Sequence, residues 1–227
     1  MAKKIYISPS SQRENRYILG DTNEAEQCRK IASAVVEALE RCGFEAKTRL
    51  DGDMYDRVRE SDQWGADLHV PIHTNSYDGK VSGTRIFCFN TTGAGYKAAK
   101  CVFDALAPLT PGTSENVSVN QNLYEVDYAN APTVYIEVEF HDVAACAKWI
   151  IENVVPVGEA IAKGICKYYG VAYVPEVTVR YAIVVEQYDT EFEADAKLDK
   201  INALVEDAQN TLVTLNDILR NAKVIKQ

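Results

Sequence analysis

Strand-like and helix-like segments alternate along the first 172 residues, and this alternation constrains the fold more than any other feature of the chain. Short segments rich in β-branched and aromatic residues predict strands at residues 4–7, 44–48, 66–72, 83–90, 123–126 and 132–140. Apolar residues at helical spacing predict helices at residues 23–42, 53–65, 95–106 and 144–169, the last broken near Pro156. The order predicts an α/β fold, with a mostly parallel, twisted sheet of about six strands and helices on both faces.

The chain divides into two predicted parts. Residues 1–172 carry the alternating pattern, and a stretch with Gly170 and Pro175 then interrupts it. Residues 173–227 hold one strand candidate and a long run with apolar residues at helical spacing. We therefore expect a main domain at 1–172 and a small C-terminal strand and helical appendage at 173–227. Such an appendage would dock on the main domain, pair with another copy of the chain or form a helical hairpin.

Composition argues against several classes of function. The net charge is −9 and no basic run occurs, whereas a nucleic-acid partner needs a basic face. No apolar run approaches the roughly 20 residues that cross a bilayer, so we expect no membrane insertion. The first ten residues lack the apolar core of a signal peptide, which predicts synthesis as a cytoplasmic protein. The six cysteines show no C-x-x-C spacing and are predicted to be reduced and buried.

Two histidines and a carboxylate fall near the ends of predicted strands. His73 follows the third predicted strand, and His141 follows the last one, which contains Glu137. In a parallel sheet these strand ends meet at one edge, where α/β proteins place their sites. A carboxylate on an inner strand is costly unless it is paired or bound to a metal. Glu24, at the start of the first long helix, is either an ordinary acidic first-turn residue or part of the same site.

These residues occur in stretches that resemble the zinc-dependent N-acetylmuramoyl-L-alanine amidases of the third amidase class, which include phage endolysins and bacterial autolysins. The resemblance covers roughly residues 3–170. Its stretches are residues 23–24, 57–62, 66–75, 83–87 and 131–142. The resemblance implies a hydrolase that cuts the amide bond between N-acetylmuramic acid and L-alanine in peptidoglycan.

The resemblance also assigns roles to individual residues. Glu24 and His73 match zinc ligands of the family, and Glu137 matches its catalytic glutamate. Zn2+ held by three protein ligands polarises a carbonyl group and lowers the pKa of water towards ~7. Glu137 would take the proton of that water and pass one to the leaving amine.

The first strand departs from the family pattern. The family's Asp-Pro-Gly-His-Gly motif supplies the third zinc ligand, but residues 8–12 read Ser-Pro-Ser-Ser-Gln, with Ser11 in the place of the histidine. Three interpretations stay open: His141 is the third ligand, Gln12 ligates through its side-chain oxygen, or the metal site is lost. Imidazole is the better zinc ligand, so His141 is preferred.

Three functions follow, in order of preference. The first is a zinc-dependent amidase of the phage endolysin type, made in the cytoplasm and reaching the cell wall after holin- or lysis-dependent release. The second is a zinc peptidase that acts on stem peptides. The third is a non-catalytic peptidoglycan-binding protein that lost its metal. In each case residues 173–227 would serve wall binding or assembly into a homo-oligomer.

Overall fold

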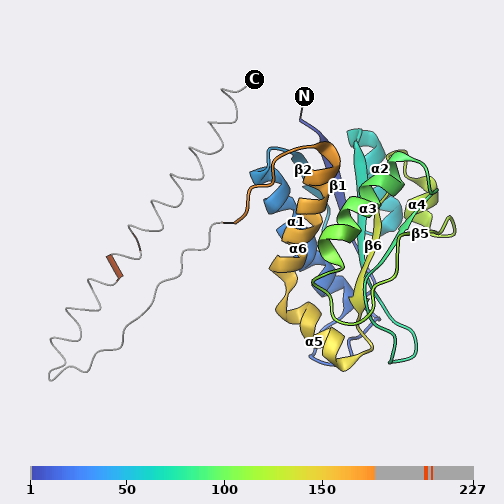
Figure 1. Cartoon of the computed structure of the whole chain (residues 1–227), viewed down its shortest axis with the longest axis vertical. Helices are drawn as coiled ribbons and strands as arrows, with labels where there is room; N and C mark the ends of the chain where they lie inside the picture. Colours follow the sequence, from blue (N-terminus) through green and yellow to red (C-terminus); the bar gives the residue numbers. More distant parts are fainter. Residues whose placement is uncertain (1, 177–201, 204–205, 207–227) are drawn as a thin grey trace. The chain divides into compact units, whose positions relative to one another are not determined.

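The structure is a computed structural model that describes residues 2–176, 202, 203 and 206, and these contain a six-stranded sheet (Figure 1). The strands are β1 Lys4–Pro9, β2 Glu45–Thr48, β3 Leu68–Asn75, β4 Arg85–Cys88, β5 Ser118–Val119 and β6 Tyr135–Phe140. Their order across the sheet is β2-β1-β3-β6-β4-β5. All neighbouring strands are parallel except β4 and β6, which pair antiparallel. The predicted mostly parallel sheet is confirmed.

Helices precede and follow these strands, and local sequence sets their ends. The helices are α1 Glu24–Arg41, α2 Met54–Trp64, α3 Ala94–Leu106, α4 Tyr124–Tyr128, α5 Ala144–Glu152 and α6 Val154–Tyr169. The side chains of Asn23 and Asp53 accept hydrogen bonds from first-turn backbone N–H groups, and thereby cap α1 and α2. Gly65 and Gly170 end α2 and α6 in the left-handed conformation, at φ of 69° and 67°, which glycine adopts without a steric penalty.

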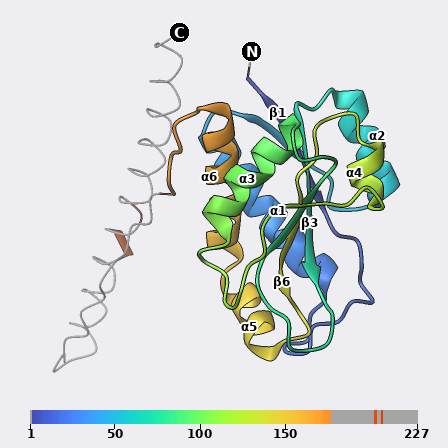
Figure 2. The ribbon, with the colours of Figure 1, turned by 45° about the vertical axis from the view of Figure 1, so that its right-hand side comes forward.

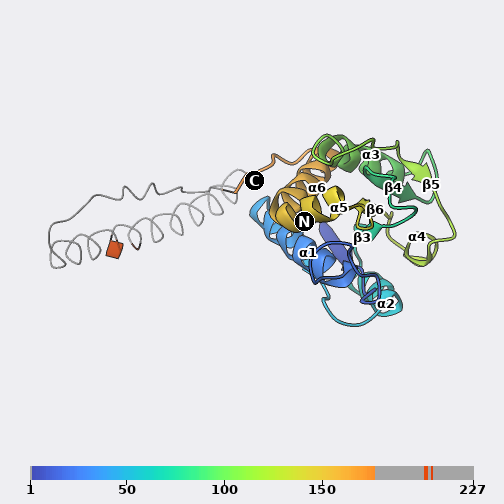
Figure 3. The ribbon, with the colours of Figure 1, turned by 90° about the horizontal axis from the view of Figure 1, so that it is seen from below.

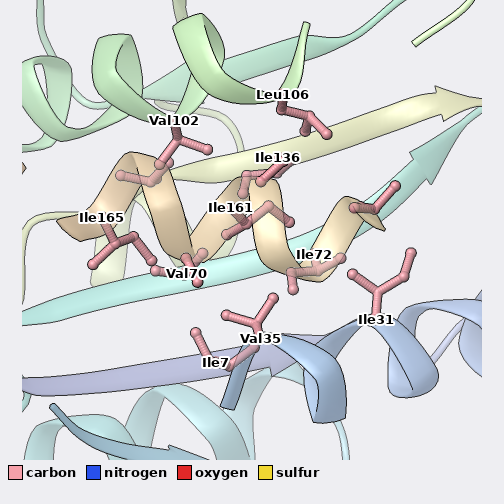
Figure 4. Packing of buried hydrophobic residues seen from close by; sticks show 14 of the residues in the cluster. Ile7, Ile31, Val35, Val70, Ile72, Val102, Leu106, Ile136, Ile161 and Ile165 are labelled. Atoms are coloured by element: carbon pink, nitrogen blue, oxygen red, sulfur yellow. The ribbon is translucent and has the colours of Figure 1, made fainter. Parts of the chain in front are cut away.

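The hydrophobic core lies between one face of the sheet and the helices α1, α3 and α6 (Figure 4). Alternate residues of a strand point to the same face, and those facing this core are fully buried. They include Ile7, Val70, Ile72 and Ile136 from the strands and Ile31, Val35, Val102, Leu106, Ile161 and Ile165 from the helices. Burying a branched aliphatic side chain contributes about 1.5–3 kcal/mol, so this layer holds the sheet in place.

The opposite face of the sheet is polar, and α2 and α4 cover it (Figures 2 and 3). The ring of Tyr6 in β1 stacks on His69 in β3, with centroids 5.6 Å apart, and its hydroxyl donates to Glu60 of α2. The Oγ of Ser61, also in α2, lies 3.0 Å from Nδ1 of His69. The prediction of helices on both faces is confirmed. The side chains of His73 and Glu137 lie on this second face.

Glycines let α6 approach its neighbours closely. A β-carbon at Gly164 would stand 2.5 Å from Cα of Val102 in α3, and one at Gly158 would stand 2.6 Å from Cβ of Ala34 in α1. Real β-carbons do not approach other atoms so closely, so any larger residue would force α6 outward. The close packing of α6 against α1 and α3 therefore depends on these two glycines.

Two predictions about individual elements are wrong. Residues 123–126, predicted as a strand, are the N-cap and the first residues of the short helix α4. This helix turns Glu125 and Val126 inward and sets Tyr124 against Tyr55 of α2, with ring centroids 4.5 Å apart. Strand β5 was not predicted, because two residues are too few to show a pattern. The predicted break in the last helix is confirmed and lies at Asn153, between α5 and α6.

The described residues up to Pro175 form one compact unit. The predicted strand at 177–185 lies outside the described residues, as does the helical run at 191–226 apart from 202, 203 and 206. The division into 1–172 and 173–227 therefore stays a prediction. Within the described part of the chain, no helix has the length and apolar character needed to cross a membrane.

Candidate active site

Glu24 and His73 form the centre of the site. Glu24 is the first residue of α1, and His73 lies near the carboxyl end of β3. Nδ1 of His73 is 2.8 Å from Oε1 of Glu24, and both side chains are buried. The ring of Tyr135 in β6 stacks on His73, with centroids 4.6 Å apart. Glu24 and His73, which are 49 positions apart in the chain, thus meet where α1 begins beside the carboxyl end of β3.

The electrostatic surroundings keep this pair charged. Burial acts to lower the pKa of His73, but the carboxylates of Glu125 and Glu24 outweigh it and raise the pKa to about 10. Burial acts to raise the pKa of Glu24, but the hydrogen bond from His73 outweighs this effect, so the pKa of Glu24 lies below its ordinary value. In the metal-free protein the pair is therefore an imidazolium and a carboxylate.

The loop between β1 and α1 orients Glu24. Nδ2 of Asn15 donates to Oε2 of Glu24 and to Oε1 of Gln12, each at 2.7 Å. The backbone N–H of Glu24 also donates to the carbonyl oxygen of Asn15, at 2.9 Å. Gln12, one of the two candidates for the third ligand, therefore connects to Glu24 through Asn15.

Glu137 lies beside His73 on the neighbouring strand. The two residues are register partners in the parallel pair of β3 and β6. The residue is partly exposed, but its Oε2 is shielded from water and has no hydrogen-bond partner among the described residues. Burial raises the pKa of Glu137 to about 8, against the lowering effect of the positive charge on His73. A carboxyl with this pKa exchanges a proton near neutral pH, as a general acid and base must.

His141 lies close to the site but is held by other residues. Its Nδ1 is 3.0 Å from Oγ1 of Thr74, which also accepts a hydrogen bond from the hydroxyl of Tyr17. The rings of His141 and Tyr17 stack, with centroids 5.0 Å apart. Burial lowers the pKa of His141, which favours the neutral imidazole that a metal requires. The assignment of His141 or Gln12 as a ligand stays a prediction.

Sequence reasoning missed Glu125. This residue of α4 is buried, and its Oε1 accepts a hydrogen bond from the hydroxyl of Ser8 and lies 3.4 Å from Nε2 of His69. Its Oε2 lies 3.8 Å from Nε2 of His73. The only signal in the sequence was a glutamate in the short apolar segment at 123–126, which the strand prediction treated as unremarkable.

The donor chemistry at the centre of the site fits zinc. Within the described residues no three His, Cys, Asp or Glu side chains form a preassembled metal-binding group. The carboxylate oxygen of Glu24 and the imidazole nitrogen of His73 nevertheless face one another, and zinc takes both types of ligand. The shielded Oε2 of Glu137 beside them has no partner to satisfy it. Two of the predicted ligands and the predicted catalytic glutamate are therefore brought together.

Solved structures of N-acetylmuramoyl-L-alanine amidases have a similar fold. The catalytic domain of CwlV, an N-acetylmuramoyl-L-alanine amidase from Bacillus (Paenibacillus) polymyxa, is similar at a TM-score of 0.68 and 22% identity, over 75% of this chain and 99% of that one. The amidase AmiC2 of Nostoc punctiforme gives 0.64 and 20%, over 74% and 97%. The catalytic domain of the CD27L endolysin, which targets Clostridia difficile, gives 0.62 and 16%, over 73% and 97%. At these identities the likeness concerns the fold.

Sequence comparison identifies the family. No curated protein sequence matches the chain. The profile of the third class of N-acetylmuramoyl-L-alanine amidases matches residues 10–167, which include every candidate site residue discussed above except Ser8. This match covers well over half of the chain and lies within the compact α/β unit, from just after β1 to near the end of α6. The chain belongs to the N-acetylmuramoyl-L-alanine amidase family.

Proposed function

We propose that this chain uses a zinc ion to hydrolyse the amide bond between N-acetylmuramic acid and L-alanine in peptidoglycan. The amide hydrolysis follows from membership of the family. The metal rests on one observation: Oε1 of Glu24 and Nδ1 of His73 face each other at 2.8 Å, beside a glutamate whose Oε2 has no partner. A buried carboxylate and imidazole so arranged are donors that a divalent zinc ion takes.

Glu24 and His73 would hold the ion, with His141 or Gln12 as the third ligand. Zinc supplies a Lewis acid that polarises the amide carbonyl and lowers the pKa of water. Asn15 fixes the carboxylate of Glu24 through its hydrogen bond to Oε2. Tyr135 restricts rotation of the His73 ring by stacking against it. These contacts orient the donors before any ion arrives, which reduces the cost of binding.

Glu137 would transfer the protons of the reaction. It takes a proton from the attacking water and delivers one to the amine nitrogen of L-alanine as the amide bond breaks. Burial raises the pKa of Glu137 to about 8 without metal, and a bound zinc cation would lower it towards neutrality, where a carboxyl both accepts and returns a proton. The partial exposure of Glu137 leaves it accessible to a substrate.

His141 and Gln12 are the two candidates for the third zinc ligand. His141 is favoured because it is a neutral imidazole close to Glu24, whose charge acts on it. Its Nδ1 contacts Thr74, which leaves Nε2 as the candidate donor atom. Gln12 offers an amide oxygen, a weaker ligand for zinc, and that oxygen accepts the hydrogen bond from Asn15.

Metal content tests the proposal. We would measure zinc in the purified wild type and in the His141→Ala and Gln12→Ala variants by elemental mass spectrometry. About one zinc per chain in the wild type, lost in His141→Ala and kept in Gln12→Ala, is the expected result. A wild type that binds no zinc after reconstitution would contradict the zinc site and favour a peptidoglycan-binding protein without catalysis.

We also propose an endolysin role, in which the chain is made in the cytoplasm and reaches the wall after release. The similarity of its fold to the catalytic domain of an endolysin supports this role. Purified protein should then clear a suspension of isolated cell walls without any partner. Walls that stay turbid, in the presence of zinc, would contradict it. Wall binding or self-association by residues 173–227 is a separate prediction, which truncation at 176 would test.

A further inference from the structure

The proposed function leaves one buried carboxylate of the site without a task. Glu125 lies on α4, on the polar side of the sheet, with its side chain 3% exposed. Its two oxygens face two different histidines: Oε1 is 3.4 Å from Nε2 of His69, and Oε2 is 3.8 Å from Nε2 of His73. A buried carboxylate is expensive without compensating partners, so its location between two imidazoles requires an explanation.

The surroundings hold Glu125 in place. The hydroxyl of Ser8 donates to its Oε1, and the hydroxyl of Thr133 donates to its backbone carbonyl oxygen at 3.2 Å. His69 is itself fixed, because Nδ1 lies 3.0 Å from Oγ of Ser61 and the ring stacks on Tyr6. The other carboxylate oxygen, Oε2, faces Nε2 of His73 in the candidate active site.

The two nitrogens of His73 therefore face two carboxylates. Nδ1 faces Glu24 on α1, and Nε2 faces Glu125 on α4. Histidines that bind metals commonly donate their other ring N–H to a carboxylate, which fixes the tautomer and the orientation of the ring. The ring of Tyr135, stacked on the face of His73, also restricts rotation of the imidazole.

We propose that Glu125 is a positioning residue that holds Nε2–H of His73 and so presents Nδ1 to the metal beside Glu24. The inference rests on the proposed zinc site. It assigns the ligand atom of His73 as Nδ1, and it makes His69, Ser8 and Ser61 the support that keeps Glu125 in place.

A purely structural role for Glu125 would be neutralisation of the buried Arg57. The hydrogen bonds of the Arg57 side chain run to backbone carbonyl oxygens of Arg49 and Gly52, at 3.1 Å each. Arg57 thus has its own partners in the loop that precedes α2. The oxygens of Glu125 are instead directed at histidines and at Ser8, which favours the positioning role.

The first measurement compares zinc affinity in the wild type and Glu125→Gln by competition with a chromogenic chelator. Loss of a carboxylate that supports a metal-binding histidine typically weakens binding about 10- to 100-fold, and we expect a loss of this size. The matched control is Glu60→Gln, which removes a partly buried carboxylate on the same side of the sheet whose partners are Tyr6 and Lys47. Zinc affinity in this control should equal that of the wild type.

The second measurement identifies the ligand atom directly in the wild-type protein. The protein is loaded with a spin-active cadmium isotope, and the couplings to isotope-labelled histidine ring nitrogens are recorded by nuclear magnetic resonance. We expect coupling to Nδ1 of His73 and a slowly exchanging proton on Nε2. A structural role alone would not determine which nitrogen couples, and this measurement does not depend on the folding of any variant.

The outcomes separate this inference from the zinc proposal. Coupling through Nε2 of His73 would overturn it, because the metal would then lie on the side of Glu125. Unchanged zinc affinity and unchanged His73 signals in Glu125→Gln would also overturn it while leaving the zinc site intact. A wild type that binds neither zinc nor cadmium would overturn both.

Discussion

Replacement of Glu137 by glutamine should abolish catalysis and at the same time raise the stability of the folded protein at alkaline pH. The Oε2 of Glu137 is shielded from water without a partner, and burial raises the pKa of this carboxyl to about 8. The folded protein therefore disfavours the charged form of Glu137. Glutamine has nearly the same shape and carries no charge, so Glu137→Gln removes this cost together with the proton transfer that catalysis requires.

The sign and size follow from proton linkage. Between the ordinary pKa of 4.5 and about 8, the folded metal-free protein keeps a proton that the unfolded chain releases. The stabilisation of the folded state by this proton is complete below pH 4.5 and is lost as the pH rises through about 8. One pKa unit corresponds to about 1.4 kcal/mol, so the free energy of unfolding of the wild type falls by up to about 5 kcal/mol across this window. Because the pKa of His73 is also raised, the free energy of unfolding falls further as the pH rises from 6.5 towards about 10.

Urea unfolding in the presence of a chelator measures this effect, at about pH 5 and about pH 8. We expect the two proteins to be similarly stable at the lower pH and Glu137→Gln to be the more stable at the higher pH. The exposed Glu40 provides the matched control, because Glu40→Gln should keep the wild-type dependence on pH. If the wild type and Glu137→Gln lose stability in parallel, the carboxyl of Glu137 is not held neutral in the folded protein and the reasoning fails.

Two further predictions concern the pair at the centre of the site and the packing of α6. Glu24→Ala leaves the buried, charged His73 without its 2.8 Å partner, so zinc binding should be lost and the free energy of unfolding without metal should fall by about 3 kcal/mol in urea titrations. Unaltered zinc content would contradict this. Gly164→Ala places a β-carbon 2.5 Å from Cα of Val102 and should cost about 1–3 kcal/mol, which calorimetry would detect as a fall of about 2–4 °C per kcal/mol. The exposed neighbour Lys163→Ala should leave the melting temperature unchanged.

The sequence was sufficient to predict the strands and helices that have a long periodic pattern. The apolar residues of β3 and α1 repeat at the spacings of a strand and a helix. The capping residues Asn23 and Gly65 mark the start of α1 and the end of α2. The segment at 123–126 has aromatic and β-branched residues, which favour a strand locally. Contacts with α2 and the sheet make it helical instead, and such contacts between distant parts of the chain cannot be inferred from four residues.

The site was predicted in part for the same reason. Glu24, His73 and Glu137 lie in stretches whose order along the chain identifies the family, and the fold brings Glu24 and His73 into contact, with Glu137 as the register partner of His73. Glu125 lies outside any such stretch, on an element of mispredicted type, and its two histidine contacts depend on how α4 packs over the sheet. The antiparallel direction of β4 could not be read from the sequence either, because strand direction depends on the path of the connecting loops.

Product analysis of digested peptidoglycan tests the central claim most directly. Purified walls would be incubated with the zinc-loaded wild type and with Glu137→Gln, and the soluble products identified by mass spectrometry. The wild type should release stem peptides that begin with a free L-alanine amino group and leave the glycan chains intact, and the variant should release almost none. Cleavage within the stem peptide, or equal release by the Glu137→Gln variant, would contradict an amidase in which Glu137 transfers the proton.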